Sequence, residues 1–170
     1  MNNLPKLFEF PGPVRKAILA FLLLQLVGVG FGLSTLFLTT ELTMSGTVTH
    51  YRGDPPPIDE FEIQENFEKP LSELLISTHN HLLGFSFIFA LLVPIFYFSS
   101  LISERIKTII MVEPFLSVLI TFLSIWGLRF VSPHFAYIIM LFGFLTYATY
   151  FFMIGMVGFE LLFKAKSDRP

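Results

Sequence analysis

Residues 74–103 read LLISTHNHLLGFSFIFALLVPIFYFSSLIS, and none of these 30 residues is Asp, Glu, Lys or Arg. About 20 apolar residues are enough for a helix to cross the hydrocarbon core of a bilayer. The stretch therefore predicts a membrane-spanning helix over residues 74–101. An imidazole inside such a helix needs a partner, so the two histidines in its early turns, His79 and His81, are the first candidates for function.

Three further charge-poor runs predict three further spans, at residues 17–40, 108–131 and 135–159. Together the four runs predict an all-α integral membrane protein, an antiparallel bundle of four transmembrane helices in a single domain covering residues 1–170. Residues 41–73 are the only extended polar segment, and we expect them to form an acidic outer loop. Within it, residues 58–69 are expected to form a short surface helix.

The composition excludes several classes of protein. Hydrophobic residues make up 54% of the chain and charged residues only 14%, which is too apolar for a soluble domain. Because there is no cysteine, disulfides, iron–sulfur clusters and covalently attached haem are excluded. No nucleotide-binding or hydrolase motif is present, and no basic patch with interleaved aromatic residues predicts a nucleic-acid partner.

The basic residues predict the orientation. If both termini lie inside, the inner segments carry eight Lys or Arg side chains and the outer segments three. By the positive-inside rule, we expect both termini in the cytoplasm and a multi-pass chain in a bacterial inner membrane. The three outer cations are Arg52, Lys69 and Arg129. The four histidines, all on the outer, periplasmic side, are His50, His79, His81 and His134.

The outer histidines suggest a haem site. His79 and His81 are two residues apart and point about 200° apart on a helix, so only one of them faces the bundle. We expect His134, in the first turn of the fourth span, at a similar depth. A pair made of His79 or His81 with His134 would suit a b-type haem between facing helices. The haem propionates would then lie near the outer cations Arg52, Lys69 and Arg129.

Two other interpretations of the histidines stay open. In one, they lie at the membrane interface without a cofactor, hydrogen-bonded to loop carboxylates or lipid headgroups. In the other, His79 and His81 bind zinc or copper, although a separation of two residues departs from the three or four that helical metal sites favour.

Two acidic residues lie within or beside the predicted spans. Glu113 lies just inside the third span and Glu160 at the inner end of the fourth. An acid at membrane depth is a candidate for a proton relay or a quinone site, and Glu113 is the stronger candidate. Alternatively, Lys107 or Lys164 neutralises these carboxylates, or water reaches them.

Three stretches resemble a family of bacterial four-span inner-membrane proteins. The first runs from Tyr51-Arg52-Gly53 to Thr78-His79-x-His81, and the second ends in Arg129-x-x-Ser132-Pro133-x-Phe135-Ala136. The third is the glycine-containing fourth span. The resemblance implies the fold, the inner-membrane location and an association with respiratory or cytochrome systems. In that family alanine is common at the position of His134, which shifts the ligand role toward His79 and His81.

Two functions are therefore expected from the sequence. The first is a small subunit of a respiratory complex that binds b-type haem near the periplasmic face and takes part in quinol-linked electron transfer. Its partners would be the bilayer, quinone, and other membrane or periplasmic subunits, and the sequence favours an electron-transfer or accessory subunit over a stand-alone enzyme. The second is a cofactor-free structural or assembly subunit of a larger membrane complex. A metal-ion or proton conductor that uses the histidines and Glu113 is a third hypothesis.

Overall fold

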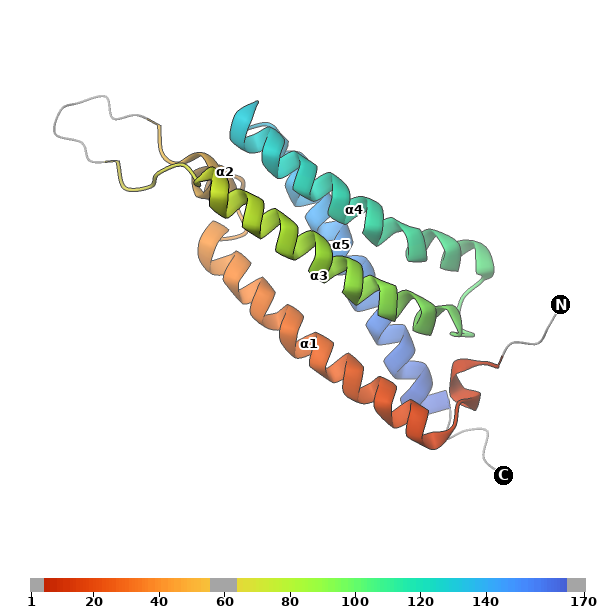
Figure 1. Cartoon of the computed structure of the whole chain (residues 1–170). Coiled ribbons are helices and arrows are strands. Elements are labelled where there is room, and N and C mark those ends of the chain that lie inside the picture. The colour runs from red at the N-terminus through yellow and green to blue at the C-terminus, as the bar shows by residue number, and fades with distance from the viewer. Residues whose placement is uncertain (1–4, 56–63, 165–170) are drawn as a thin grey trace.

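The computed structural model describes residues 5–55 and 64–164, and four long helices run alternately up and down within it (Figure 1). They are α1 (Gly12–Thr40), α3 (Leu71–Tyr97), α4 (Glu104–Phe130) and α5 (Phe135–Phe159). Each helix is long and apolar enough to cross a membrane. No strand occurs among the described residues. The predicted all-α bundle with four candidate spans is therefore confirmed.

The helices extend beyond the charge-poor runs at several ends. α1 begins at Gly12 instead of residue 17, with Pro13 in its first turn, where the missing N–H leaves no hydrogen bond unmade. α3 covers Leu71–Tyr97 instead of 74–101, and α4 begins at Glu104 instead of residue 108. α5 has the predicted bounds, and a π-helical turn, η2 (Glu160–Lys164), follows it. Charged residues extend the helices because backbone hydrogen bonding does not require apolar side chains.

A further helix, α2 (Met44–Arg52), lies in the segment predicted to be a loop. The hydroxyl of Thr43 accepts a hydrogen bond from the Gly46 N–H at 3.0 Å and caps the start of the helix. Gly53 ends it with φ 75°, in the left-handed region that favours glycine. Residues 64–69 are not helical, so the prediction of a surface helix over 58–69 is wrong there, and residues 58–63 lie outside the described residues.

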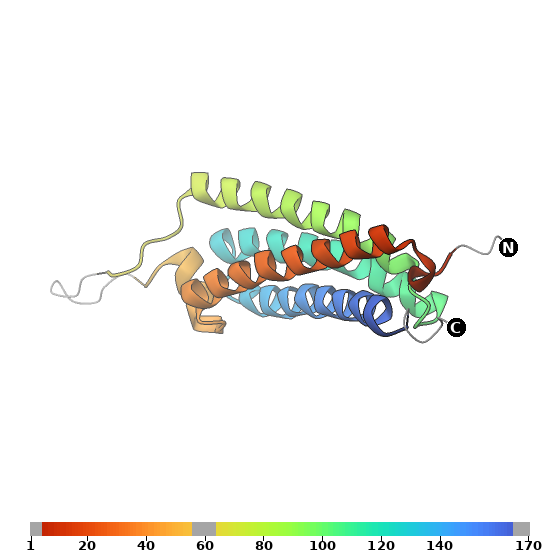
Figure 2. The same ribbon diagram turned by 90° about the horizontal axis from the view of Figure 1, so that it is seen from below.

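The four long helices do not share the burial equally. α1 lies on the side of the bundle opposite α4, between α3 and α5 (Figures 1 and 2). Only four α1 residues are buried, against eight in α4. α4 and α5 form the closest pair, because Gly127 leaves room for the Phe135 ring; a Cβ at Gly127 would lie 2.5 Å from that ring. The core is therefore centred on α3, α4 and α5.

The two ends of the bundle carry different structures. We call the end with α2 the outer end. The other end, the inner end, carries η2 and a short 3-10 turn, η1 (Leu7–Glu9). Leu7 is completely buried there, and its N–H donates to the carbonyl oxygen of Phe98 at 3.0 Å. The first and last described segments therefore meet at the same end, as an even number of spans requires, and the membrane side that this end faces stays a prediction.

Candidate functional site

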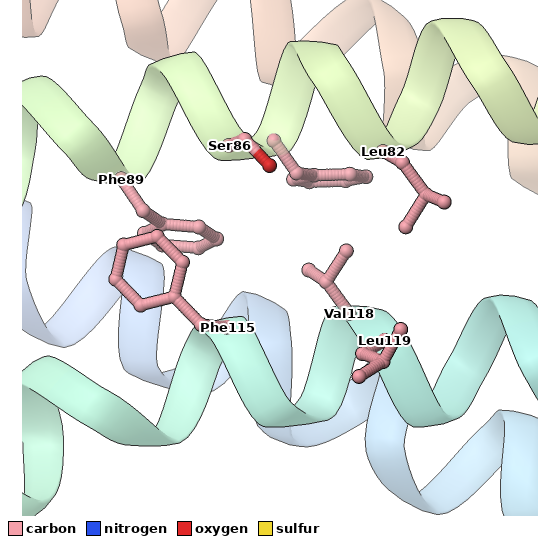
Figure 3. A pocket seen from close by; sticks show the side chains of 7 residues that line it. Leu82, Ser86, Phe89, Phe115, Val118 and Leu119 are labelled. Atoms are coloured by element: carbon pink, nitrogen blue, oxygen red, sulfur yellow. The ribbon is translucent and has the colours of Figure 1, made fainter.

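A pocket of about 310 Å³ lies between α3 and α4, near the middle of both helices (Figure 3). Residues spaced three or four apart place one face of α3 against it. The Phe89 and Phe115 rings meet edge to face with centroids 5.8 Å apart and close one end. The residues that line the pocket are Leu82, Phe85, Ser86, Phe89, Phe115, Val118 and Leu119. The pocket is therefore apolar except for the Ser86 hydroxyl.

His81 directly precedes Leu82, the first α3 residue that lines this pocket, and its side chain is exposed. Its Nδ1 lies 2.7 Å from the carbonyl oxygen of Ser77, one turn earlier in α3. Because a carbonyl oxygen only accepts, Nδ1 carries the proton of the neutral ring and Nε2 is left as an acceptor. The ring centroid lies 5.5 Å from that of Phe122 on α4 and 6.4 Å from that of Phe85, which lines the pocket. One of the two α3 histidines therefore faces the neighbouring helix.

Ser86 is the second polar group at the pocket. Its hydroxyl points into the space between α3 and α4 (Figure 3) and forms no hydrogen bond with any described residue. Other helical hydroxyls satisfy themselves on their own backbone, as Thr146 does by donating to Phe142 O at 2.9 Å. Ser86 lies about 7.5 Å further along the helix axis than His81. The apolar pocket thus offers an unpaired hydroxyl to a ligand, and the His81 imidazole lies just outside its lining, about 140° away from Ser86 around the helix axis.

The other two predicted haem ligands lie elsewhere. His79 is exposed and forms no hydrogen bond with another described residue. His134 is exposed at the start of α5, where its ring stacks on Tyr137 with centroids 6.5 Å apart. The described residues therefore do not bring two imidazoles together as a pair of axial ligands. A haem bound by two histidines of this chain therefore stays a prediction without geometric support. Of His79, His81 and His134, His81 is the one whose ring lies against a neighbouring span, beside Phe122 of α4.

A metal centre is not formed by the described part of the chain. Across residues 5–55 and 64–164, no three His, Asp or Glu side chains gather in a way that could hold a metal ion. The zinc or copper site expected at His79 and His81 would need ligands from elsewhere.

Two of the outer cations are paired with protein acceptors. Arg129, near the end of α4, forms an ion pair with Glu68 at 2.8 Å and donates from Nε to the carbonyl oxygen of Lys69 at 3.3 Å. The Lys69 ammonium lies 3.2 Å from Nε2 of His50 and 5.4 Å from the centre of the Tyr51 ring. These contacts attach the segment after the acidic loop to both α2 and α4.

His50 had no partner in the sequence-based prediction. In the structure, burial and the Lys69 ammonium lower the pKa of His50 below its usual 6.5, while Glu73 opposes them with a smaller effect. The contact arises because α2 places His50 beside residue 69, and α2 itself was not predicted. The Thr43 cap and the Gly53 stop were the sequence signals that could have revealed it.

Arg52 lines a second, outer pocket of about 430 Å³. Its buried Nη1 has no partner among the described residues. The other residues lining this pocket are Asp54, Gln64, Phe67 and Glu68. Of the three cations predicted to face haem propionates, Arg52 is therefore the one with a buried donor that has no partner among the described residues.

Glu160 is 0% exposed at the inner end and is fully hydrogen-bonded. Its carboxylate accepts from the Ser99 hydroxyl at 2.7 Å, from the Ser100 hydroxyl at 2.7 Å and from the Ser100 N–H at 2.9 Å. Lys164 reaches the carboxylate only through Ser100, to whose hydroxyl it donates at 2.8 Å. Lys107 donates to Tyr97 O and Glu104 instead. The π-helical turn therefore binds the α3–α4 connection.

Glu113 lies about two and a half turns into α4, deeper than the sequence predicted. The Ser117 hydroxyl donates to Oε1 of Glu113, and Oε2 is buried without a described partner. On α5, Tyr150 is 2% exposed, and its buried hydroxyl also has no partner among the described residues. These polar atoms are exceptions to the rule that buried polar groups are hydrogen-bonded.

The comparisons with known proteins identify the family of the chain but give no relative whose activity is known. A family model for a transmembrane helical domain, Aq_1264_TM, matches residues 41–168, which include α2 to α5 and leave out α1. Neither a curated protein nor a solved structure matches the chain. Because the matched range covers most of the chain and all of the helices around the pocket, the chain belongs to the Aq_1264_TM family of transmembrane helical domains.

Proposed function

We propose that this chain is a small integral membrane subunit that binds a quinol in the α3–α4 pocket and takes part in quinol-linked electron transfer in a bacterial inner membrane. The observation that carries the proposal is the apolar α3–α4 pocket, into which the unpaired Ser86 hydroxyl points and beside which the His81 ring lies next to Phe85 and Phe122. The family match supports the membrane-spanning character of the protein.

The chemistry of the pocket suits a lipid-soluble aromatic ring with two oxygen atoms. Phe85, Phe89 and Phe115 supply aromatic walls, against which such a ring packs favourably. One quinol hydroxyl donates to Nε2 of His81, and the hydroxyl of Ser86 meets the second oxygen. Leu119, on the rim, is 47% exposed, so the ligand can enter sideways from the bilayer.

Oxidation of a quinol releases two electrons and two protons. Nε2 of His81 is placed to take one of these protons, because the protonated ring still donates from Nδ1 to Ser77 O. The second proton would leave to water at the outer end, and a haem centre held by this chain or by a partner subunit would be the acceptor of the electrons. A b-type haem bound to His81 would use the same Nε2, so quinol and haem compete for this atom.

Quinol binding is tested by calorimetric titration of the protein in nanodiscs with decylubiquinol. We expect His81→Ala and Ser86→Ala each to weaken binding about fivefold, since one net hydrogen bond is worth roughly 1 kcal/mol. Decylubiquinone should bind more weakly than the quinol, because Nε2 accepts and does not donate. The matched control is Asn80→Ala, on an exposed neighbour that does not line the pocket. Equal affinity of His81→Ala and wild type would refute the proposal.

The absorbance spectrum of the purified protein tests the haem. A Soret band lost in His81→Ala would assign a haem to His81 and would contradict the quinol site. A band lost in His79→Ala but kept in His81→Ala would support a haem bound elsewhere on α3. Quinol binding without a Soret band would place the electron acceptor in a partner subunit.

A cofactor-free assembly subunit is the second candidate, and the position of α1 favours it. α1 lies outside the matched range of the family model, and only four of its residues are buried in the chain's own bundle. Its exposed large side chains include Leu23, Leu24, Phe31 and Leu38. This function predicts a colourless protein that binds no quinol and is purified within a larger complex. Substitutions at the exposed α1 residues should then release the partner subunits.

A further inference from the structure

Two ammonium groups converge on one phenylalanine ring at the inner end. Lys6 Nζ lies 5.8 Å from the centre of the Phe8 ring, and Lys164 Nζ lies 5.0 Å from the same centre. The two lysines come from opposite ends of the described chain, one beside η1 and the other at the end of η2. The fold therefore brings two cations to the same ring, and an anion bound near both would relieve their mutual repulsion.

The segments that carry these charges are held firmly. Leu7 is fully buried beside Phe8 and donates to Phe98 O at 3.0 Å. Lys164 donates to the Ser100 hydroxyl, which in turn donates to the buried Glu160 carboxylate. The convergence of the two lysines thus follows from buried contacts.

A third cation, Arg15 of α1, lies at the same end. Its Nη2 donates to the carbonyl oxygen of Leu161 at 2.7 Å, which fixes the guanidinium beside η2. Its Nε is buried and has no partner among the described residues. The guanidinium of Arg15 thus adds a third positive charge at this end, together with an N–H donor that could bind an anion.

The nearby acids form no direct ion pair with these cations. Glu9 accepts a hydrogen bond from the backbone N–H of Lys6 at 2.8 Å, and the Glu160 oxygens accept from Ser99 and Ser100. The two ion pairs found within the described residues, Lys107–Glu104 and Arg129–Glu68, involve none of the three cations. The charges of Glu9 and Glu160 offset part of the positive charge of the group formed by Lys6, Arg15 and Lys164, and three cations against these two acids leave a net positive charge at this end.

We infer that this group binds the phosphate of an anionic phospholipid. The site lies where α1 begins and α5 ends, at the height of the headgroups for helices that span the bilayer. Arg and Lys are the side chains that bind phosphate, and basic groups at the cytoplasmic ends of spans recognise anionic headgroups. The predicted orientation places this end in the cytoplasm. The inference is independent of the quinol proposal.

The test measures thermal unfolding of the delipidated protein with added phosphatidylglycerol, phosphatidylcholine or inorganic phosphate. We expect phosphatidylglycerol alone to raise the midpoint. The double variant Lys6→Gln/Lys164→Gln should weaken this binding about 30-fold, from the known contribution of each lysine near a membrane surface. The matched control is Lys16→Gln/Arg105→Gln, which removes the same charge from two exposed positions at the inner end.

Each contrary outcome overturns the inference. An equal loss in the control would mean that only net charge matters, and an equal effect of inorganic phosphate would mean a free-anion site. If the double variant does not fold, Lys6→Gln alone is used, because Lys6 is exposed. Native mass spectrometry then counts the phosphatidylglycerol molecules retained, and an unchanged count would refute the site.

Discussion

The Ser99 hydroxyl and the Glu160 carboxylate lie 2.7 Å apart, although 61 residues separate them in the chain. This bond and those to Ser100 join the turn after α3 to the end of α5. An acid buried without an ion pair is tolerated here because both of its oxygens accept hydrogen bonds.

Replacing Glu160 by alanine should therefore destabilise the protein by about 2–4 kcal/mol, because the buried Ser99 hydroxyl and the Ser100 N–H would lose their acceptor. The measurement is the free energy of unfolding in detergent micelles. Glu65→Ala, at an exposed loop position, is the control and should have almost no effect. A Glu160→Ala variant as stable as the control would show that the carboxylate network contributes nothing.

Stability should depend on pH through His50. Its pKa is lowered in the folded protein, mainly by burial and then by Lys69, so the folded state favours the neutral ring. The resulting stabilisation is complete above pH 6.5, the usual pKa, and is lost as the pH falls from there through the lowered value. Comparing unfolding midpoints of wild type and His50→Gln across this range isolates the effect. An identical pH dependence in both would contradict it.

Gly127→Ala should destabilise the α4–α5 pair, by about 1–3 kcal/mol, because overpacking forces the helices apart. The added Cβ would lie 2.5 Å from the Phe135 ring. Gly143→Ala on α5 is the matched control, since a Cβ there meets nothing within 4 Å. Combining Gly127→Ala with Phe135→Leu should recover part of the loss in chemical unfolding, and no recovery would place the strain elsewhere.

Tyr150→Phe should leave the stability unchanged or raise it by about 1 kcal/mol, because the variant removes a buried hydroxyl that has no described partner. Thermal unfolding in nanodiscs provides the measurement. A clear destabilisation would instead reveal a partner for the hydroxyl, such as an internal water molecule shared with Glu113.

The four spans were predictable because a long charge-free run has few alternatives to a membrane helix. Helix ends were less predictable: Ser72 and Glu73 belong to α3 although they are polar. α2 was missed because its nine residues are few and on average polar, and its evidence was confined to the cap at Thr43 and the stop at Gly53.

The candidate site was only partly predictable. The opposed directions of His79 and His81 follow from helix geometry, but which of them faces α4 depends on how α3 packs, and His81 is the one that meets Phe122. The buried Glu160 network could not be foreseen, because its donors come from a turn 60 residues earlier in the chain. Ser86 was overlooked since a serine in a membrane helix commonly bonds to its own backbone.

Three groups of Lys69, its backbone N–H, its backbone carbonyl and its ammonium, contact α2 and α4. Its N–H donates to Tyr51 O and its ammonium reaches His50 on α2, while its carbonyl oxygen accepts from Arg129 at the end of α4. A force applied to the outer segment would thus be transmitted through Lys69 and the neighbouring Arg129–Glu68 ion pair to α4, the helix that forms one wall of the pocket. The outer segment is therefore mechanically coupled to the membrane-spanning helices through these contacts.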